Sequence, residues 1–190
     1  MPPCDIMNRN GKIGLVAAVT VILPLSYYLY TKYYSKFSAK DAVSSSSLTE
    51  SKCKRKVVIL YGTSTGTART LASKLLQTLL ALDNCFSSEN VVLKDLQNYD
   101  EDTLFEKEDI VILLCSTWSE GRPPEHAQRF FEWLRDYRYD FRVSKAAFEK
   151  IIFASFGLGG AIYGHNFCKP VYEFHECLSA LGATAILEPV

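Results

Sequence analysis

A loop made of hydroxyl residues and glycine carries the clearest chemical signal in this sequence. It follows the apolar run Val57–Tyr61, and a helical pattern begins directly after it. Small residues leave backbone N–H groups accessible, hydroxyl groups donate hydrogen bonds, and the N-terminus of a helix carries partial positive charge. We therefore predict that this loop binds a phosphate group. Its residues are Thr63, Ser64, Thr65, Gly66, Thr67 and Ala68.

The residues after Gly66 narrow the kind of phosphate ligand. A Walker A loop needs a lysine directly after its last glycine, and this sequence has Thr67, Ala68 and Arg69 there. The three-glycine spacing of the dinucleotide fingerprint is also missing. A cradle of hydroxyls without lysine suits one terminal phosphomonoester. A polar turn that only joins a strand to a helix is the alternative.

Two further loops each place one aromatic ring beyond a strand-like run. Trp118 lies in Ser116–Gly121, and Tyr163 lies in the glycine-rich stretch Gly157–Phe167. Two rings from separate loops can stack on the two faces of a flat heterocycle. The alternative is that each ring covers a hydrophobic edge of the protein.

The elements that must position these loops alternate between strand-like and helix-like patterns. Apolar β-branched runs predict strands at 57–61, 91–93, 110–115, 151–156 and 184–187. Apolar residues repeating every three or four positions predict helices at 68–82, from Pro123 to about Tyr137, and from Pro170 to a capping Gly182. A single helical turn is predicted at 100–105.

This alternation predicts an α/β fold, a doubly wound parallel sheet of five strands with helices on both faces. In such sheets, ligands bind beyond the carboxyl ends of the strands, where the strand order reverses. With the strand order 2-1-3-4-5, all three loops would converge on one site. A phosphate group together with a clamped planar ring indicates FMN.

The first part of the chain has a different character. Residues 13–31 contain no charge, lie between Lys12 and Lys32, and would form a helix about 28 Å long, close to a bilayer core. We predict an N-terminal tail at 1–12, a transmembrane anchor at 13–31, a flexible Ser/Lys-rich linker at 32–55 and a folded domain at 56–190. More basic residues follow the anchor than precede it, which places the domain in the cytosol. A cleaved signal peptide is the alternative.

Charge and cysteine content exclude other classes. Basic and acidic residues balance at 21 each, so we expect no direct nucleic-acid binding by this chain. The six cysteines form no CxxC pair, which favours reduced, mostly buried thiols over a disulfide framework or a metal site. His126 and His175 are predicted to be surface or packing residues within helices. His165, in the third loop, is a candidate for the pocket.

The three loops together resemble those of a flavodoxin-type FMN domain over about Lys56 to Pro189, which implies a flavodoxin-like sheet. The resemblance implies that Thr63–Ala68 bind the phosphate and that Trp118 and Tyr163 cover the two faces of the flavin. It implies no catalytic acid, base or nucleophile. The further cofactor-binding residues implied are Ser116, Thr117, Ser119, Gly121, Leu158, Gly159, Gly160, His165, Asn166 and Phe167.

Two groups of proteins combine such a domain with an apolar N-terminal segment: eukaryotic tRNA 4-demethylwyosine synthases and microsomal NADPH-dependent diflavin reductases. Asp140-Phe141-Arg142, Phe148 and Ser119 resemble the synthases more closely. This resemblance implies electron transfer from an upstream NAD(P)H-dependent reductase to an iron–sulfur acceptor, in wybutosine biosynthesis, or to a haem acceptor in the reductase alternative. It also implies anchoring in the endoplasmic reticulum membrane.

Several positions depart from the family pattern. Gly160 stands where asparagine is usual, and Cys168 stands near another usual asparagine. The domain is expected to be C-terminally incomplete because the acidic loop after the fifth strand is not in the sequence. The radical-SAM CxxxCxxC triplet is also not in this sequence. A membrane-tethered interaction module without cofactor therefore stays open. A phosphoacceptor receiver would need Asp where Cys115 stands.

Overall fold

The structure, a computed structural model, describes residues 55–82, 86–101 and 108–189. The predicted tail, the anchor and nearly all of the linker lie outside the described residues, as does most of the predicted turn at 100–105. Within the described ranges, no helix has the length and apolar character needed to span a bilayer.

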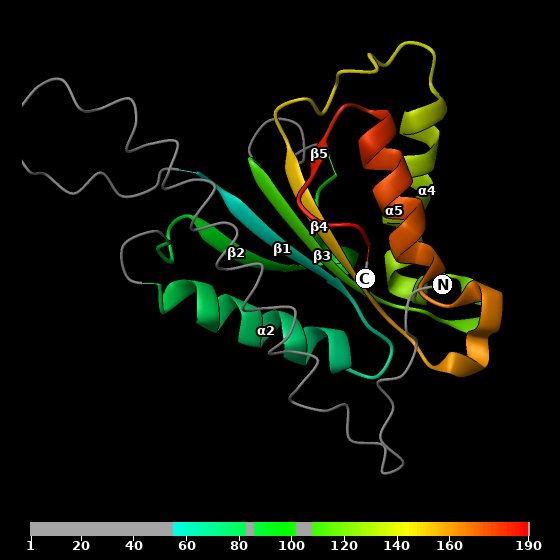
Figure 1. The fold of residues 1–190 in the computed structure, drawn as a ribbon, viewed down its shortest axis with the longest axis horizontal. Helices are drawn as coiled ribbons and strands as arrows, with labels where there is room; N and C mark the ends of the chain where they lie inside the picture. Colours follow the sequence, from blue (N-terminus) through cyan, green and yellow to red (C-terminus); the bar gives the residue numbers. More distant parts are fainter. Residues whose placement is uncertain (1–54, 83–85, 102–107, 190) are drawn as a thin grey trace, which may run out of the picture. The chain divides into compact units, whose positions relative to one another are not determined.

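The described elements follow the predicted alternation (Figure 1). The strands are β1 (Val57–Gly62), β2 (Val91–Asp95), β3 (Ile110–Ser116), β4 (Ile152–Leu158) and β5 (Thr184–Ala185). The α-helices are α2 (Thr67–Leu80), α4 (Gln128–Tyr139) and α5 (Lys169–Ala180). Short 3₁₀ helices are η1 (Leu96–Asn98), η2 (Ser119–Gly121), η3 (Glu125–Ala127) and η4 (Ala161–Asn166).

The strands form one parallel sheet with the order β2-β1-β3-β4-β5, which confirms the predicted topology. β3 lies in the middle and pairs with β1 from Ile110 to Cys115 and with β4 along its whole length. Its residues from Ile110 to Cys115 are all buried, as expected for a central strand covered on both faces. The carboxyl ends of β1, β3 and β4 therefore reach the same edge of the sheet.

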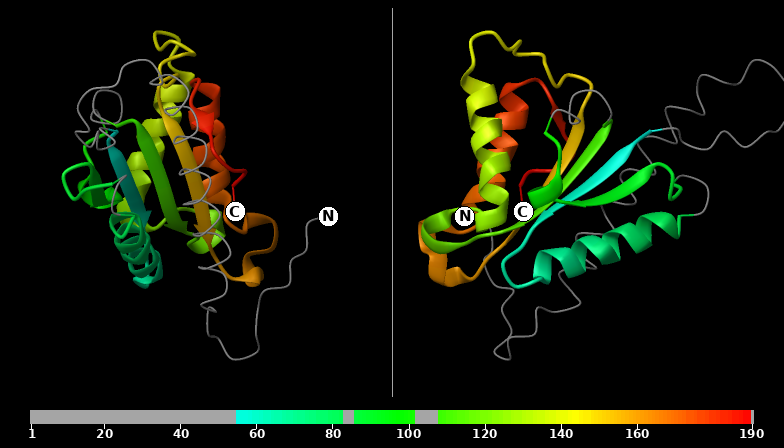
Figure 2. Two further views of the ribbon diagram at one scale, coloured as in Figure 1. Left: turned by 60° about the vertical axis from the view of Figure 1, so that its left-hand side comes forward. Right: turned by 180° about the vertical axis from the view of Figure 1, so that it is seen from behind.

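Helices cover both faces of the sheet, with α2 on one side and α4 with α5 on the other (Figure 2). Alternate side chains of a strand point to opposite faces. In β1, Val58 and Leu60 belong to the core on the α4 and α5 side. This core contains five phenylalanines that are almost completely buried: Phe130, Phe131, Phe148, Phe153 and Phe174. Burial of each side chain stabilises the fold by about 1.5–3 kcal/mol.

Most element boundaries differ from the predictions by one or two residues, and three of the differences have a clear physical reason. β2 runs on to Asp95, because an edge strand pairs through its backbone even where its side chains are polar. α4 begins at Gln128, because η3 separates the two prolines from the helix. β5 ends at Ala185, although the N–H of Ile186 still donates to the carbonyl of Phe153. The cap at Gly182 is confirmed, with φ at +91°.

Candidate functional site

The first loop leaves β1 at Gly62 and enters α2 at Thr67. The Thr63 Oγ1 atom accepts a hydrogen bond from the Gly66 N–H at 2.9 Å, which closes the loop on itself. The Thr65 and Thr67 hydroxyl oxygens lie 3.3 Å apart and share one hydrogen. Since each hydroxyl carries one donor, the Thr63 hydrogen and one of the other two remain for an incoming anion.

The N-terminus of α2 is open toward solvent at this loop. Gly66 occupies the N-cap position with φ at +87°, and no side chain caps the helix. A Cβ atom built on Gly66 would meet no atom within 4 Å. The N–H groups of the first helical turn have no partner within the helix, so they are free to hold an anion. The residues present therefore fit a phosphate group.

The second loop follows β3 and turns tightly at Trp118. The Trp118 N–H donates to the Arg122 carbonyl at 2.8 Å, and the Gly121 N–H donates to the Trp118 carbonyl at 3.1 Å. Gly121 has φ at +75°, and Glu120 also lies in the left-handed region, at +59°. The turn leaves the Trp118 side chain 48% exposed, so its ring is available to cover a ligand.

The third loop follows β4 and contains η4. The Tyr163 N–H donates to the Gly160 carbonyl, and the Phe167 N–H donates to the Gly164 carbonyl, both at 3.1 Å. Tyr163 is half-buried, His165 is exposed, and Phe167 is 41% exposed. In the described part of the chain, the rings of Trp118 and Tyr163 do not touch each other.

The second and third loops pack directly against each other. A Cβ on Gly121 would lie 2.8 Å from the Cβ of Asn166, so only glycine fits there. A Cβ on Gly159 would lie 3.1 Å from the Thr117 Oγ1 atom. The Thr117 N–H donates to the Leu158 carbonyl at 2.6 Å and continues the sheet pairing beyond β3. The two loops thus form one continuous surface.

Thr117 joins this surface to the start of α5. It is 5% exposed, and its Oγ1 atom accepts a hydrogen bond from the Cys168 N–H at 3.1 Å. Cys168 is the N-cap of α5 and has φ at +53°. The buried hydroxyl of Thr117 therefore fixes the end of the third loop.

We expect Thr117→Val to lower the free energy of unfolding by about 1–3 kcal/mol, because it leaves the buried Cys168 N–H without an acceptor. Thr117→Ser keeps the hydroxyl and should cost clearly less. Urea denaturation of the full chain measures both variants. Equal losses would show that the hydroxyl does not hold the loop.

The thiols at this edge are protonated at neutral pH. Burial raises the pKa of the Cys115 thiol far above its ordinary value. Burial also raises the pKa of Cys168 to about 11, against a smaller opposing effect of the hydrogen bond with Thr117. Cys115, Cys168 and Cys177 are buried and free, which confirms the predicted thiols for these three. Cys4, Cys53 and Cys85 lie outside the described residues.

The first loop is tied to the second through the sheet. The Ser116 Oγ atom donates to the Gly62 carbonyl at 3.4 Å, and Gly62 pairs with Cys115 in the register of β1 and β3. The structure thus places all three predicted loops at one edge of the sheet. The individual contacts of the predicted site residues with a ligand stay predictions.

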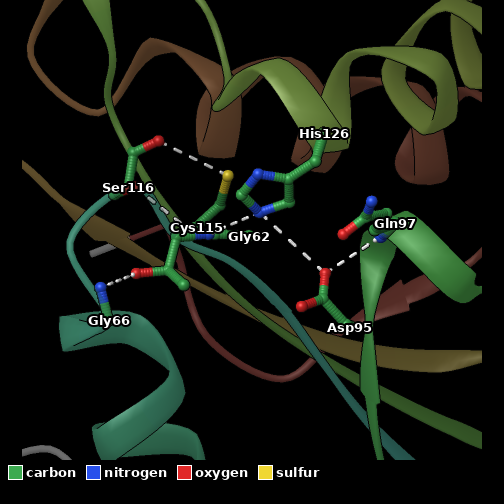
Figure 3. Close-up of polar contacts among 8 residues, drawn as sticks. Gly62, Gly66, Asp95, Gln97, Cys115, Ser116 and His126 are labelled. Carbon is green, nitrogen blue, oxygen red and sulfur yellow. Dashed lines mark hydrogen bonds and ion pairs between the residues drawn. The ribbon is translucent and has the colours of Figure 1, made fainter.

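Two histidines differ in their surroundings. His175 lies in α5 and packs edge-on against Phe153, with the ring centroids 5.1 Å apart, as predicted for a packing residue. His126 lies in η3, and its Nε2 atom accepts from the N–H of Thr63 (Figure 3). His126 lies within a helix as predicted, although this helix is the 3₁₀ helix η3 and not α4. Its contact with the first loop was missed. The position of His126 in the sequence, shortly after the second loop, could have indicated that it lies near the site.

Comparisons with known proteins agree with this geometry. The flavodoxin family matches residues 59–190. The human S-adenosyl-L-methionine-dependent tRNA 4-demethylwyosine synthase TYW1 is 33% identical over 135 residues, covering 69% of this chain and 18% of the synthase. The sulfite reductase [NADPH] flavoprotein alpha-component of Thiocapsa roseopersicina is 30% identical over 139 residues, covering 73% of this chain and 24% of that protein.

A solved structure agrees as well. Oxidised flavodoxin 2 from Bacillus cereus superposes with a TM-score of 0.56 at 29% identity, covering 71% of this chain and 82% of the flavodoxin. This chain spans about a fifth to a quarter of the length of the two curated relatives described above.

Proposed function

This chain belongs to the flavodoxin family, whose cofactor is FMN, and we propose that its three carboxyl-edge loops grip FMN by the phosphate and by both faces of the ring. The observation that carries the proposal is that the uncapped N-terminus of α2 and the half-exposed Trp118 both lie at the carboxyl edge of the sheet. The family supports a role in electron transfer.

Each loop has a separate task in this proposal. Residues Thr63–Ala68 hold the phosphate through hydroxyl and backbone N–H donors. The rings of Trp118 and Tyr163 would cover the two faces of the isoalloxazine and exclude water from them. The backbone from Trp118 to Gly121 would face the polar edge of the ring. Leu158, Gly159, Gly160, His165, Asn166 and Phe167 complete the rim.

Bound FMN supplies the redox chemistry, since a flavin exchanges electrons both in pairs and singly. The protein's own residues bind the flavin, orient it and set its surroundings. The pKa values of Cys115 and Cys168 are raised by burial, so the nearby thiols stay neutral and add no negative charge at the site. Because Trp118 is half-exposed, one edge of the bound flavin ring would lie near solvent, where a partner protein can approach.

The acceptor we propose is the iron–sulfur cluster of a radical-SAM enzyme in tRNA wybutosine biosynthesis. The likeness to tRNA 4-demethylwyosine synthases over the flavodoxin region supports this choice. An NAD(P)H-dependent reductase would supply the electrons. We also propose that residues 13–31 anchor the chain in the endoplasmic reticulum membrane with the folded domain in the cytosol.

A second candidate is the FMN module of an NADPH-dependent diflavin reductase. The match to sulfite reductase flavoprotein components favours it. The two candidates differ in the acceptor. The FMN-loaded chain, reduced and mixed anaerobically with either a radical-SAM tRNA-modifying enzyme or a haem protein, should be reoxidised faster by the acceptor that it serves. Stopped-flow absorbance of the flavin band measures both rates.

FMN binding itself is tested with the full 190-residue chain in detergent. One equivalent of FMN should be bound with quenched fluorescence. Riboflavin lacks the phosphate and should bind about tenfold to a hundredfold more weakly, because charge-assisted hydrogen bonds contribute about 1.5–3 kcal/mol. Unquenched fluorescence in excess FMN would contradict the proposal and favour the interaction module without cofactor.

A further inference from the structure

His126 lies between the phosphate-binding loop and an acidic side chain. Its Nε2 atom is 3.5 Å from the Thr63 nitrogen and 3.9 Å from the Asp95 Oδ1 atom (Figure 3). The first distance is a long hydrogen bond in which the Thr63 N–H donates, and the second lies beyond hydrogen-bond range. Both side chains are about three-quarters buried, so water competes only partly for these contacts.

Asp95 is held in place independently of His126. It ends β2, and its Oδ1 atom accepts from the Gln97 N–H at 3.0 Å, which caps η1. The Tyr61 hydroxyl lies close enough to the Asp95 carboxylate for the two groups to interact electrostatically. Burial raises the pKa of Tyr61, and Asp95 raises it further. The carboxylate is therefore a fixed partner beside the imidazole.

One nitrogen cannot serve both neighbours at once. A neutral imidazole with its proton on Nδ1 offers a lone pair at Nε2 and accepts from the Thr63 N–H. An imidazolium carries a hydrogen on both nitrogens and can only donate. Protonation therefore ends the contact with Thr63 and turns Nε2 toward the Asp95 carboxylate.

The other titratable groups around Asp95 and the start of the first loop come from three elements. Tyr61 lies on β1, and Arg69 lies on α2, where its charge lowers the pKa of Tyr61. Cys115, on β3, packs against Gly62, and burial keeps its thiol neutral. Asp95 is therefore the negatively charged group that competes for a protonated His126.

We propose that His126 is a positioning residue for the phosphate-binding loop: neutral, it holds the first backbone N–H of that loop, and protonated, it releases it to pair with Asp95. The inference rests on the proposed FMN site and adds that its affinity for FMN is regulated by pH. Affinity for a phosphomonoester should fall with falling pH by more than the ligand's own titration explains.

The test compares the full chain with His126→Gln, whose amide carbonyl can accept from the Thr63 N–H and does not titrate. FMN binding is measured from pH 8 to pH 5.5. The phosphate itself titrates near pH 6, so the informative quantity is the ratio of the two dissociation constants at each pH. We expect the dissociation constant of the wild type, divided by that of His126→Gln, to rise from about one to about five on acidification. A fivefold change corresponds to the free energy that one hydrogen bond contributes.

Two further probes make the result specific. Riboflavin should show no such rise, because it has no phosphate. Asp95→Asn keeps an oxygen acceptor for the Gln97 N–H but removes the anionic partner of the imidazolium, so it should reduce the acid effect. A ratio that stays constant across the pH range would overturn the proposal.

A readout without FMN separates this inference from the proposed function. In the ligand-free chain, the Thr63 amide resonance should shift with pH in the wild type and stay nearly fixed in His126→Gln. If FMN failed to bind while this difference appeared, the FMN site would be refuted and the His126 contact upheld. If FMN bound and the Thr63 amide behaved alike in both proteins, the His126 proposal would be refuted alone.

Discussion

Trp118→Ala should weaken FMN binding by about fivefold to 150-fold. Stacking of a planar base on an aromatic side chain is worth about 1–3 kcal/mol, and the Trp118 ring is free to stack because 48% of it is exposed at the sheet edge. Removal of an exposed ring creates no cavity in the core, so the fold should keep its stability. Fluorescence titration with FMN measures the loss.

Two control variants make this result interpretable. Phe141→Ala removes a ring that is 95% exposed on the connection from α4 to β4, away from the three loops, and should leave binding unchanged. His175→Ala, within α5, should also have a smaller effect than Trp118→Ala. Trp118→Phe should keep most of the affinity. An equal loss in Trp118→Ala and His175→Ala would contradict the proposed clamp.

Gly157→Ala should lower the free energy of unfolding by about 1–3 kcal/mol, or the unfolding midpoint by about 3–9 °C. A Cβ on Gly157 would fall well inside van der Waals contact with the Cβ and Sγ atoms of Cys168. Neither backbone can move away easily, because Gly157 pairs with Cys115 in the sheet and the Cys168 N–H donates to the Thr117 hydroxyl. Thermal unfolding of the full chain measures the effect.

A second substitution tests the cause of that loss. Cys168→Gly removes the clashing atoms, and glycine suits the left-handed backbone at φ +53°. The double variant should therefore recover most of the stability lost in Gly157→Ala. Cys168→Gly alone is the control, because it measures what loss of the buried Cys168 side chain costs by itself. A double variant no more stable than Gly157→Ala would refute the proposed clash.

Much of the fold could be predicted because its signals are local. The run from Ile110 to Cys115 is apolar throughout, and a strand buried on both faces requires this. The end of β2 was missed, because Lys94 and Asp95 pair through their backbone and carry no apolar signal. The length of β5 was overestimated for the opposite reason: Ile186 and Leu187 are apolar, but they lie beyond the end of the strand.

The loops of the site could also be predicted, because hydroxyls, glycines and single aromatics are unusual at strand ends. Their mutual packing could not. The fit of Gly121 against Asn166, the left-handed backbone of Cys168 and the contact between His126 and Thr63 each depend on how segments far apart in the sequence meet. Residue types alone do not encode such distances.

The central claim is that three loops at one sheet edge form a single FMN site. Backbone amide resonances of the full chain, followed during titration with FMN, test it most directly. We expect resonances from 63–68, 116–121 and 157–167 to change together and to stop changing at one equivalent, while those of the α4 C-terminal end stay fixed. Changes confined to one loop, or no change in excess FMN, would contradict the account.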